Sequence, residues 1–117
     1  MGSNPNDCRA YMHMKDIRIA AVILNCPVGR IADNLERMAG WVEAAKNQGV
    51  DLVCFPEMNV TGYSTGANIK NVAESVPGKI SQSVLAMAQE FNIVILAGLA
   101  EVDLAGRIFA SYLVATE

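Results

Sequence analysis

Glu57 stands where an apolar segment of this sequence should simply stop. Residues 52–55 read Leu-Val-Cys-Phe, and Pro56 separates them from the carboxylate. If the segment is a buried parallel strand, Glu57 lies at its carboxyl end, where catalytic groups gather in open α/β sheets. A carboxylate fixed there, beside partly desolvated apolar surface, can act as a general base. The plainer alternative is a solvated loop residue, although Pro56 fixes its own φ angle and so directs the chain as it leaves the sheet.

A general base needs a nucleophile to activate, and the two nearby cysteines are weak candidates. In a regular strand Glu57 shares a face with Phe55, whereas Cys54 points to the opposite face. We therefore expect Cys54 to be a buried core thiol. Cys26 ends the preceding apolar segment and could approach the same sheet edge, but Pro27 follows it and no lysine accompanies it.

The segments around Glu57 predict an α/β fold with a mixed sheet. Apolar residues alternate or run continuously in four segments and recur at helical spacing in two others. The predicted strands are residues 17–24, 50–55, 93–100 and 107–115, and the predicted helices run from Asp33, as N-cap, to Gly49 and from Gly78 to Asn92. The first strand, helix and strand form a βαβ unit, and the tight turn before the last strand makes the final pair antiparallel. Residues 1–14 form a polar tail, and residues 15–117 form the folded part.

Composition excludes several classes of partner. The chain has 117 residues, a net charge of -3 and a hydrophobic fraction of 52%, so it lacks the basic surface that nucleic acid or an anionic membrane requires. No apolar run approaches the roughly 20 residues of a bilayer span, and no signal peptide is recognisable. A cytoplasmic protein is therefore expected.

Metal and cofactor sites are not indicated by the sequence. The cysteines, Cys8, Cys26 and Cys54, are odd in number and lack metal-ligand spacing, and His13 stands alone in the polar tail. A nucleotide-binding domain is also disfavoured, because only Gly29 follows the first strand where a phosphate-binding loop needs several glycines. We expect no metal and no cofactor.

Several short stretches together carry a family resemblance. They are Ile-Arg-Ile-Ala at 17–20, Asn-Leu-Glu-Arg at 34–37, Gly-Val-Asp-Leu-Val at 49–53, Phe-Pro-Glu at 55–57, Thr-Gly-Tyr at 61–63 and Ile-Val-Ile at 93–95 with Gly98. In this order they resemble the start of a carbon-nitrogen hydrolase of the nitrilase superfamily, over residues 15–117. The resemblance implies the N-terminal part of a four-layer α-β-β-α sandwich, with a mixed sheet and helices on one face.

The resemblance also implies a chemistry. Such hydrolases cleave amide, N-carbamoyl or nitrile carbon-nitrogen bonds with a Glu-Lys-Cys set, in which Glu57 would be the general base and Tyr63 would pack over the substrate pocket. The expected partners are a small amide or nitrile substrate and further copies in a homo-oligomer. The family's lysine and cysteine lie further along than residue 117, and Lys70 and Lys79 are outside the lysine motif, so both are expected to be solvated. We therefore expect the chain to be a truncated portion that is inactive alone.

The sequence departs from the family pattern at one point. Ser111 and Tyr112 stand about where relatives commonly carry an Asn-Thr or Asn-Ser pair, which puts the subfamily in doubt. The alternative function is a non-catalytic α/β binding or assembly module that keeps the family's front half, because an open sheet edge and an uncovered apolar face recruit partners.

Overall fold

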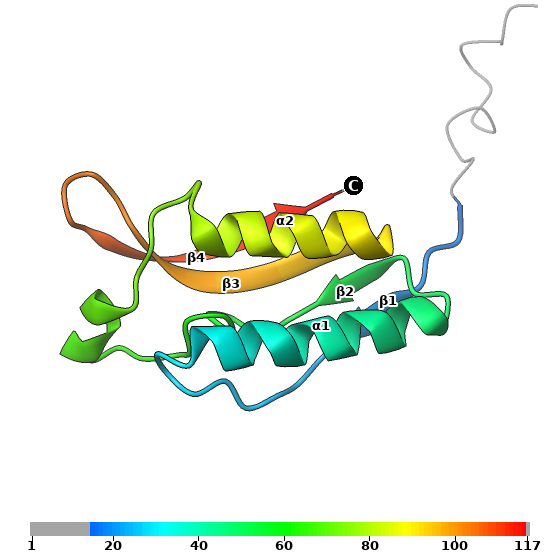
Figure 1. Cartoon of the computed structure of the whole chain (residues 1–117), viewed down its shortest axis with the longest axis horizontal. Coiled ribbons are helices and arrows are strands. Elements are labelled where there is room, and N and C mark those ends of the chain that lie inside the picture. Colours follow the sequence, from blue (N-terminus) through cyan, green and yellow to red (C-terminus); the bar gives the residue numbers. More distant parts are fainter. Residues whose placement is uncertain (1–14, 117) are drawn as a thin grey trace, which may run out of the picture.

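The computed structural model describes residues 15–116, so the predicted tail, with Cys8 and His13, lies outside the described residues. Helices and strands alternate along the chain and end in a strand hairpin (Figure 1). The elements are β1 (Ile19–Ala21), α1 (Ile31–Asn47), β2 (Leu52–Cys54), the short 3-10 helix η2 (Ala67–Asn71), α2 (Lys79–Phe91), β3 (Val94–Val102) and β4 (Ile108–Ala115). The predicted α/β order is confirmed.

The four strands form one mixed sheet in sequence order. β1 pairs parallel with β2, β2 pairs parallel with β3, and β4 closes the sheet antiparallel to β3. The predicted antiparallel pair at one side is therefore confirmed. The first two strands are much shorter than the sequence pattern suggested, because each has only three residues in the sheet.

Both helices cover the same face of the sheet (Figure 1). One buried cluster joins α1, through Met38 and Val42, to α2, through Val84, and to the strand residues that point toward the helices. Those strand residues include Val53, Ile95 and Leu99, all with a relative exposure of 0%. Burial of such side chains contributes about 1.5 to 3 kcal/mol each, so this layer stabilises the fold.

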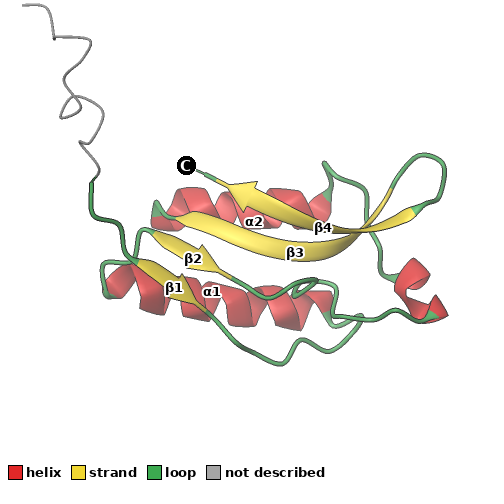
Figure 2. Cartoon of the chain, turned by 180° about the vertical axis from the view of Figure 1, so that it is seen from behind, coloured by secondary structure: helices red, strands yellow, loops and turns green. Residues whose placement is uncertain are grey.

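None of the helices in residues 15–116 covers the opposite face of the sheet, as the view from behind shows (Figure 2). Alternate residues of the strands still point to it, and most of them are apolar. Ile19 is 60% exposed and Val114 is 67% exposed, whereas Gly98 and Ala100 on β3 are buried. The open face is therefore bare at the β1 and β4 edges and covered where β3 passes beneath the chain that follows β2.

The helix ends agree with the sequence signals at three of four positions. Gly49 has a φ angle of 75° and follows α1, and Asn92 adopts the left-handed conformation as the C-cap of α2. Gly78 is the N-cap of α2, as predicted. The predicted cap at Asp33 is wrong: α1 begins at Ile31 after Arg30, and Asp33 lies in the first turn, where its negative charge favours the helix N-terminus.

Candidate active site

A turn that follows β2 takes the place of a strand beside β3. The Val60 N–H donates to the Gly98 carbonyl at 3.0 Å, as a strand residue would. Side-chain oxygens accept hydrogen bonds from two alternate β3 amides: Gly98 N–H donates to Asn59 Oδ1, and Ala100 N–H donates to Thr61 Oγ1, both at 2.9 Å. Asn59 and Thr61 are buried, so the β3 edge is satisfied without a regular ladder. We call residues 56–62 the Glu57 turn.

Two glycines allow the Glu57 turn to approach its neighbours. A Cβ atom on Gly98 would lie 2.3 Å from the Met58 backbone nitrogen. Gly62 has a φ angle of 86°, and its Cβ would lie 2.4 Å from the Val28 Cα atom. Side chains at either position would therefore collide with backbone, and at Gly62 the left-handed conformation adds strain.

The Glu57 turn is also held from the helix side. Asn34 on α1 is fully buried, and its Nδ2 donates to the Pro27 carbonyl and to the Val60 carbonyl, both at 3.0 Å. Arg37 donates to Asn34 Oδ1 at 2.8 Å, which fixes the orientation of the amide. One side chain thus ties the loop after β1 to the Glu57 turn.

Helical spacing alone does not predict the role of Asn34. A signal was present, since Asn34 precedes Met38 by four residues and so lies on the apolar face of α1. A polar side chain in such a place is buried, and a buried polar side chain must find partners.

The turn contains two strained or costly features next to Glu57. Met58 has a φ angle of 54°, a left-handed conformation that costs a non-glycine residue about 1 to 3 kcal/mol. The Asn59 Nδ2 atom is buried with no hydrogen-bond partner within residues 15–116, which costs about 1 to 3 kcal/mol. Such costs concentrate at functional sites.

Glu57 and Tyr63 line one hollow of about 260 Å³. The other residues that line it come from the Glu57 turn, the segment up to η2 and the start of β4; they are Met58, Ser64, Thr65, Ile69, Ile108, Phe109 and Ala110. The structure thus brings together the two residues that the sequence singled out. The volume of the hollow is slightly below the roughly 300 Å³ of the smallest typical small-molecule binding sites.

The expected desolvation of Glu57 is not found. β2 ends at Cys54, so Glu57 does not continue the apolar row of Val53 and Phe55, and it is exposed. Tyr63 is 61% exposed. Both side chains therefore face open space at the edge of the sheet.

The expectation that Cys54 is a core thiol is also wrong. Cys54 is half-buried on the open face, and its sulfur lies 3.1 Å from the Tyr112 hydroxyl oxygen. The Tyr112 hydroxyl itself donates to the Phe55 carbonyl. Because a phenol carries one proton, the Cys54 thiol is the donor to the Tyr112 oxygen.

Cys26 is half-buried and does not line the hollow that holds Glu57. Partial burial raises the pKa of the Cys26 thiol, and the positive charge of Arg37 opposes this shift only in part. A thiol that stays protonated is a poor nucleophile. Lys70 and Lys79 are exposed, as expected, and neither lines the hollow.

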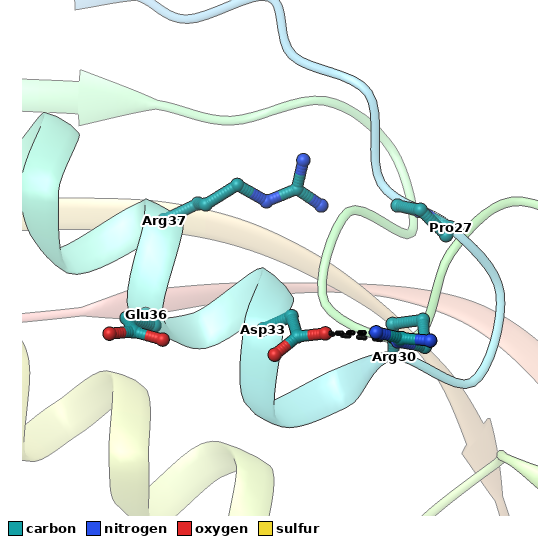
Figure 3. A pocket seen from close by; sticks show the side chains of 5 residues that line it. All are labelled: Pro27, Arg30, Asp33, Glu36 and Arg37. Atoms are coloured by element: carbon teal, nitrogen blue, oxygen red, sulfur yellow. Dashed lines mark hydrogen bonds and ion pairs between the residues drawn. The ribbon is translucent and has the colours of Figure 1, made fainter.

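A second hollow, of about 440 Å³, lies at the start of α1 (Figure 3). It is lined by Pro27, Arg30, Asp33, Glu36 and Arg37. Arg30 and Asp33 form an exposed ion pair at 2.8 Å, which contributes about 0 to 1 kcal/mol. The lining contains two guanidinium groups and two carboxylates, so their formal charges cancel. The hollow therefore has no net preference for an anion or a cation.

Within residues 15–116, neither α-helix combines the length and apolar character needed to cross a membrane. In the same part of the chain no three metal-binding side chains of His, Cys, Asp or Glu lie together.

Comparison with known proteins identifies the family to which this fold belongs. The family model for carbon-nitrogen hydrolases matches residues 18–116. The chain belongs to the carbon-nitrogen hydrolase family, and the resemblance drawn from the sequence is confirmed.

Individual relatives agree with that assignment. The omega-amidase of Danio rerio is 33% identical over 97 residues, which are 82% of this chain and 34% of that protein. Glutamine-dependent NAD(+) synthetase of Xylella fastidiosa is 42% identical over 48 residues, or 40% of this chain and 9% of that protein. The chain thus spans about a third or less of the length of these curated relatives.

Solved structures show the same fold. A CN-hydrolase superfamily protein from Xanthomonas campestris, solved with an arsenic adduct in its active site, superposes with a TM-score of 0.76 and 26% identity, covering 88% of this chain and 37% of that one. Saccharomyces cerevisiae Nit3, a member of branch 10 of the nitrilase superfamily, gives a TM-score of 0.74 at 24% identity, covering 86% of this chain and 40% of that one. The fold is that of the nitrilase superfamily.

Proposed function

We propose that residues 15–117 form the front part of a hydrolase that cleaves non-peptide carbon-nitrogen bonds in small amides, N-carbamoyl compounds or nitriles. In this proposal Glu57 is the general base and Tyr63 lines the substrate pocket. The observation that carries the proposal is that Glu57, in the Glu57 turn, and Tyr63, which follows the turn, line one hollow at the carboxyl end of β2.

The rigidity of the turn supports this role. A general base works only within hydrogen-bond reach of the proton that it removes, so its backbone must be fixed. Asn34, Asn59 and Thr61 hold the turn from two sides through buried hydrogen bonds. A solvated loop would need no such anchoring, and this weighs against the plainer interpretation of Glu57.

The hollow lacks two members of the set that the family uses. No lysine and no cysteine is among the residues that line it, while hydrolysis through a thiol needs a nucleophile and a fixed positive group for the developing oxyanion. We propose that these groups come from chain beyond residue 117, and that the 117 residues alone do not turn over substrate.

The test measures ammonia release from a panel of aliphatic amides, N-carbamoyl amino acids and nitriles. In the protein that contains the whole domain, Glu57→Gln should lower the rate by at least about 100-fold, the usual contribution of a general base. Glu90→Gln, at an exposed position on α2, is the matched control and should not change it. Wild-type turnover by the Glu57→Gln variant would overturn the role of Glu57.

The same panel tests whether the 117 residues suffice. Purified alone, the chain should release no ammonia. Clear turnover that survives Cys26→Ala would show that the site is already complete and would overturn this part of the proposal.

A non-catalytic assembly module is the second proposal, and the bare part of the open sheet face favours it. Ile19, Ile23 and Val114 are 60%, 93% and 67% exposed, and an apolar surface of this kind recruits a covering layer. Light scattering of the 117-residue chain should then show concentration-dependent association that Ile19→Ser reduces. A monomer at every concentration would contradict this proposal and the expected homo-oligomer.

A further inference from the structure

Tyr112 reaches across the sheet to the end of β2. It belongs to β4 and lies opposite Gly98 in the register with β3. Neighbouring strands are about 4.8 Å apart, so a β4 side chain must cross β3 to touch β2. The Tyr112 hydroxyl makes this contact, donating to the Phe55 carbonyl.

The Phe55 carbonyl is the point at which the chain leaves the sheet. The Phe55 N–H makes the last hydrogen bond to β3 before the Glu57 turn, donating to the Leu96 carbonyl at 2.9 Å. The next residue is Pro56, which has no N–H to continue the ladder. The Tyr112 hydroxyl therefore supplies the contact that fixes the peptide between Phe55 and Pro56, immediately before Glu57.

The far end of the turn is fixed separately. Gly98 binds Asn59 and Val60 through its N–H and its carbonyl. Glu57 and Met58 thus lie between two anchors, and the Met58 conformation is left-handed. Loss of either anchor lets Met58 relax, since a strained backbone persists only where its surroundings hold it.

We infer that Tyr112 is a positioning residue, whose hydroxyl holds the Phe55 carbonyl and thereby sets where Glu57 enters the hollow. Cys54 supports it, because its sulfur lies 3.1 Å from the phenol oxygen and 4.0 Å from the Phe55 carbonyl oxygen. The inference rests on the proposed role of Glu57, and it assigns a function to a tyrosine outside the motif that holds Glu57 and Tyr63.

The first test uses Tyr112→Phe in the 117-residue chain, because this substitution removes only the hydroxyl. Hydrogen exchange should become about five-fold faster at the amides of Asn59, Val60 and Gly62, as expected for the loss of one hydrogen bond. The ¹³C signal of the Glu57 carboxylate should also shift. Amides in α1 and α2 should exchange as in the wild type.

Two variants serve as controls for that measurement. Ser111→Ala removes the neighbouring β4 hydroxyl, which binds Glu101 at 2.7 Å and not the turn, and should leave the turn amides unchanged. Cys54→Ser keeps a donor to the phenol oxygen and should also behave as wild type. If Tyr112→Phe accelerates exchange throughout the chain, or shifts no Glu57 signal, the residue is merely structural and the inference is overturned.

The second test is kinetic and uses the protein that contains the whole domain. Tyr112→Phe should lower kcat by about 10- to 100-fold, because small displacements of a catalytic group have effects of this size, and should change KM little. In a Glu57→Gln background it should have no further effect, since a positioning residue acts only through the group that it positions. Additive losses would overturn the inference.

The outcomes separate this inference from the proposed function. If Glu57→Gln leaves hydrolysis unchanged, the proposed function fails, while the exchange and ¹³C measurements still report whether Tyr112 fixes the turn. If Glu57→Gln abolishes hydrolysis and Tyr112→Phe has the rate of the wild type, only the positioning role fails.

Discussion

Both faces of the sheet are apolar, yet the rest of the chain covers them to different extents. The helix face is closed by α1 and α2, and its strand residues Val53, Ile95 and Leu99 have no exposure. The open face is bare at its edges, where Ile19 and Val114 are more than half exposed, and closed in the middle by the Glu57 turn. Burial on the first face stabilises the fold, and burial on the second positions a carboxylate.

The largest loss of stability is expected from a substitution in the covered part of the open face, where ordinary surface would tolerate an added methyl group. Gly98→Ala places a Cβ atom 2.3 Å from the Met58 nitrogen, so the Glu57 turn must move. The free energy of unfolding should fall by about 3 kcal/mol or more, at the upper end for overpacking. Urea denaturation measures this loss.

Gly40→Ala is the matched control for Gly98→Ala. Gly40 lies within α1, and no atom lies within 4 Å of the Cβ that alanine would add. Alanine is the better helix former by up to about 1 kcal/mol, so this variant should be slightly more stable than wild type. Equal effects of the two variants would show that the turn does not rest on Gly98.

Two leucines of β3 compare the faces directly. Leu99 points to the helices and is fully buried, whereas Leu96 points to the open face and is half-buried. Leu99→Ala should lower the free energy of unfolding by about 3 kcal/mol, because it leaves a cavity in a packed layer. Leu96→Ala should cost about 1 kcal/mol, since it removes less buried area.

Thermal or urea unfolding of both leucine variants supplies the measurement. If Leu96→Ala costs as much as Leu99→Ala, the open face is covered in solution, and self-association of the chain should then be visible in the same samples.

A smaller effect is expected where the turn replaces a strand. Thr61→Val keeps the shape of the side chain but removes the oxygen that accepts the Ala100 N–H. An unpaired buried amide costs about 1 to 3 kcal/mol, so the variant should be less stable by about 2 kcal/mol. Thr61→Ser keeps the hydroxyl and should lose clearly less; a larger loss in the serine variant would mean that the methyl group matters more than the hydrogen bond.

The smallest effect concerns pH and belongs to the open face. Partial burial raises the pKa of the Tyr112 phenol above its ordinary value. The folded chain therefore keeps this proton at pH values where an unfolded tyrosine ionises, so the contribution is fully present below about pH 10 and is lost as the pH rises further.

Melting temperatures of wild type and Tyr112→Phe from about pH 8 to about pH 11 measure this contribution, because they bracket the ordinary tyrosine pKa of about 10. The wild type should lose more stability than the variant across that range. Parallel curves would show that the phenol titrates alike in both states.

The sequence pattern predicted the elements of the fold and missed the contacts that fix the site. Gly49 and Asn92 marked helix ends because both adopt the left-handed conformation there. The short extent of β1 and β2 was not predictable, since apolar residues beyond a strand are buried by packing as readily as within it.

The site itself was half predictable. Glu57 and Tyr63 stood out through their motif, and the structure places both at one hollow. The partners of the turn came from residues distant in the chain: Asn34 on α1, Gly98 on β3 and Tyr112 on β4. Only tertiary packing brings these together, and the exposure of Glu57 could not be inferred from a strand period that ended three residues earlier.

The unequal lengths of the strand pairs also order the events of folding. β3 and β4 pair over eight positions across a short connection, while β1 and β2 pair over three positions on either side of α1. Pairing close in sequence has the lower loop-closure cost and the higher rate. The β3–β4 hairpin should therefore form early, with Gly98 and Tyr112 already in place to contact the Glu57 turn. The Glu57 turn would dock on it late, so substitutions in the turn should speed unfolding and leave the folding rate almost unchanged.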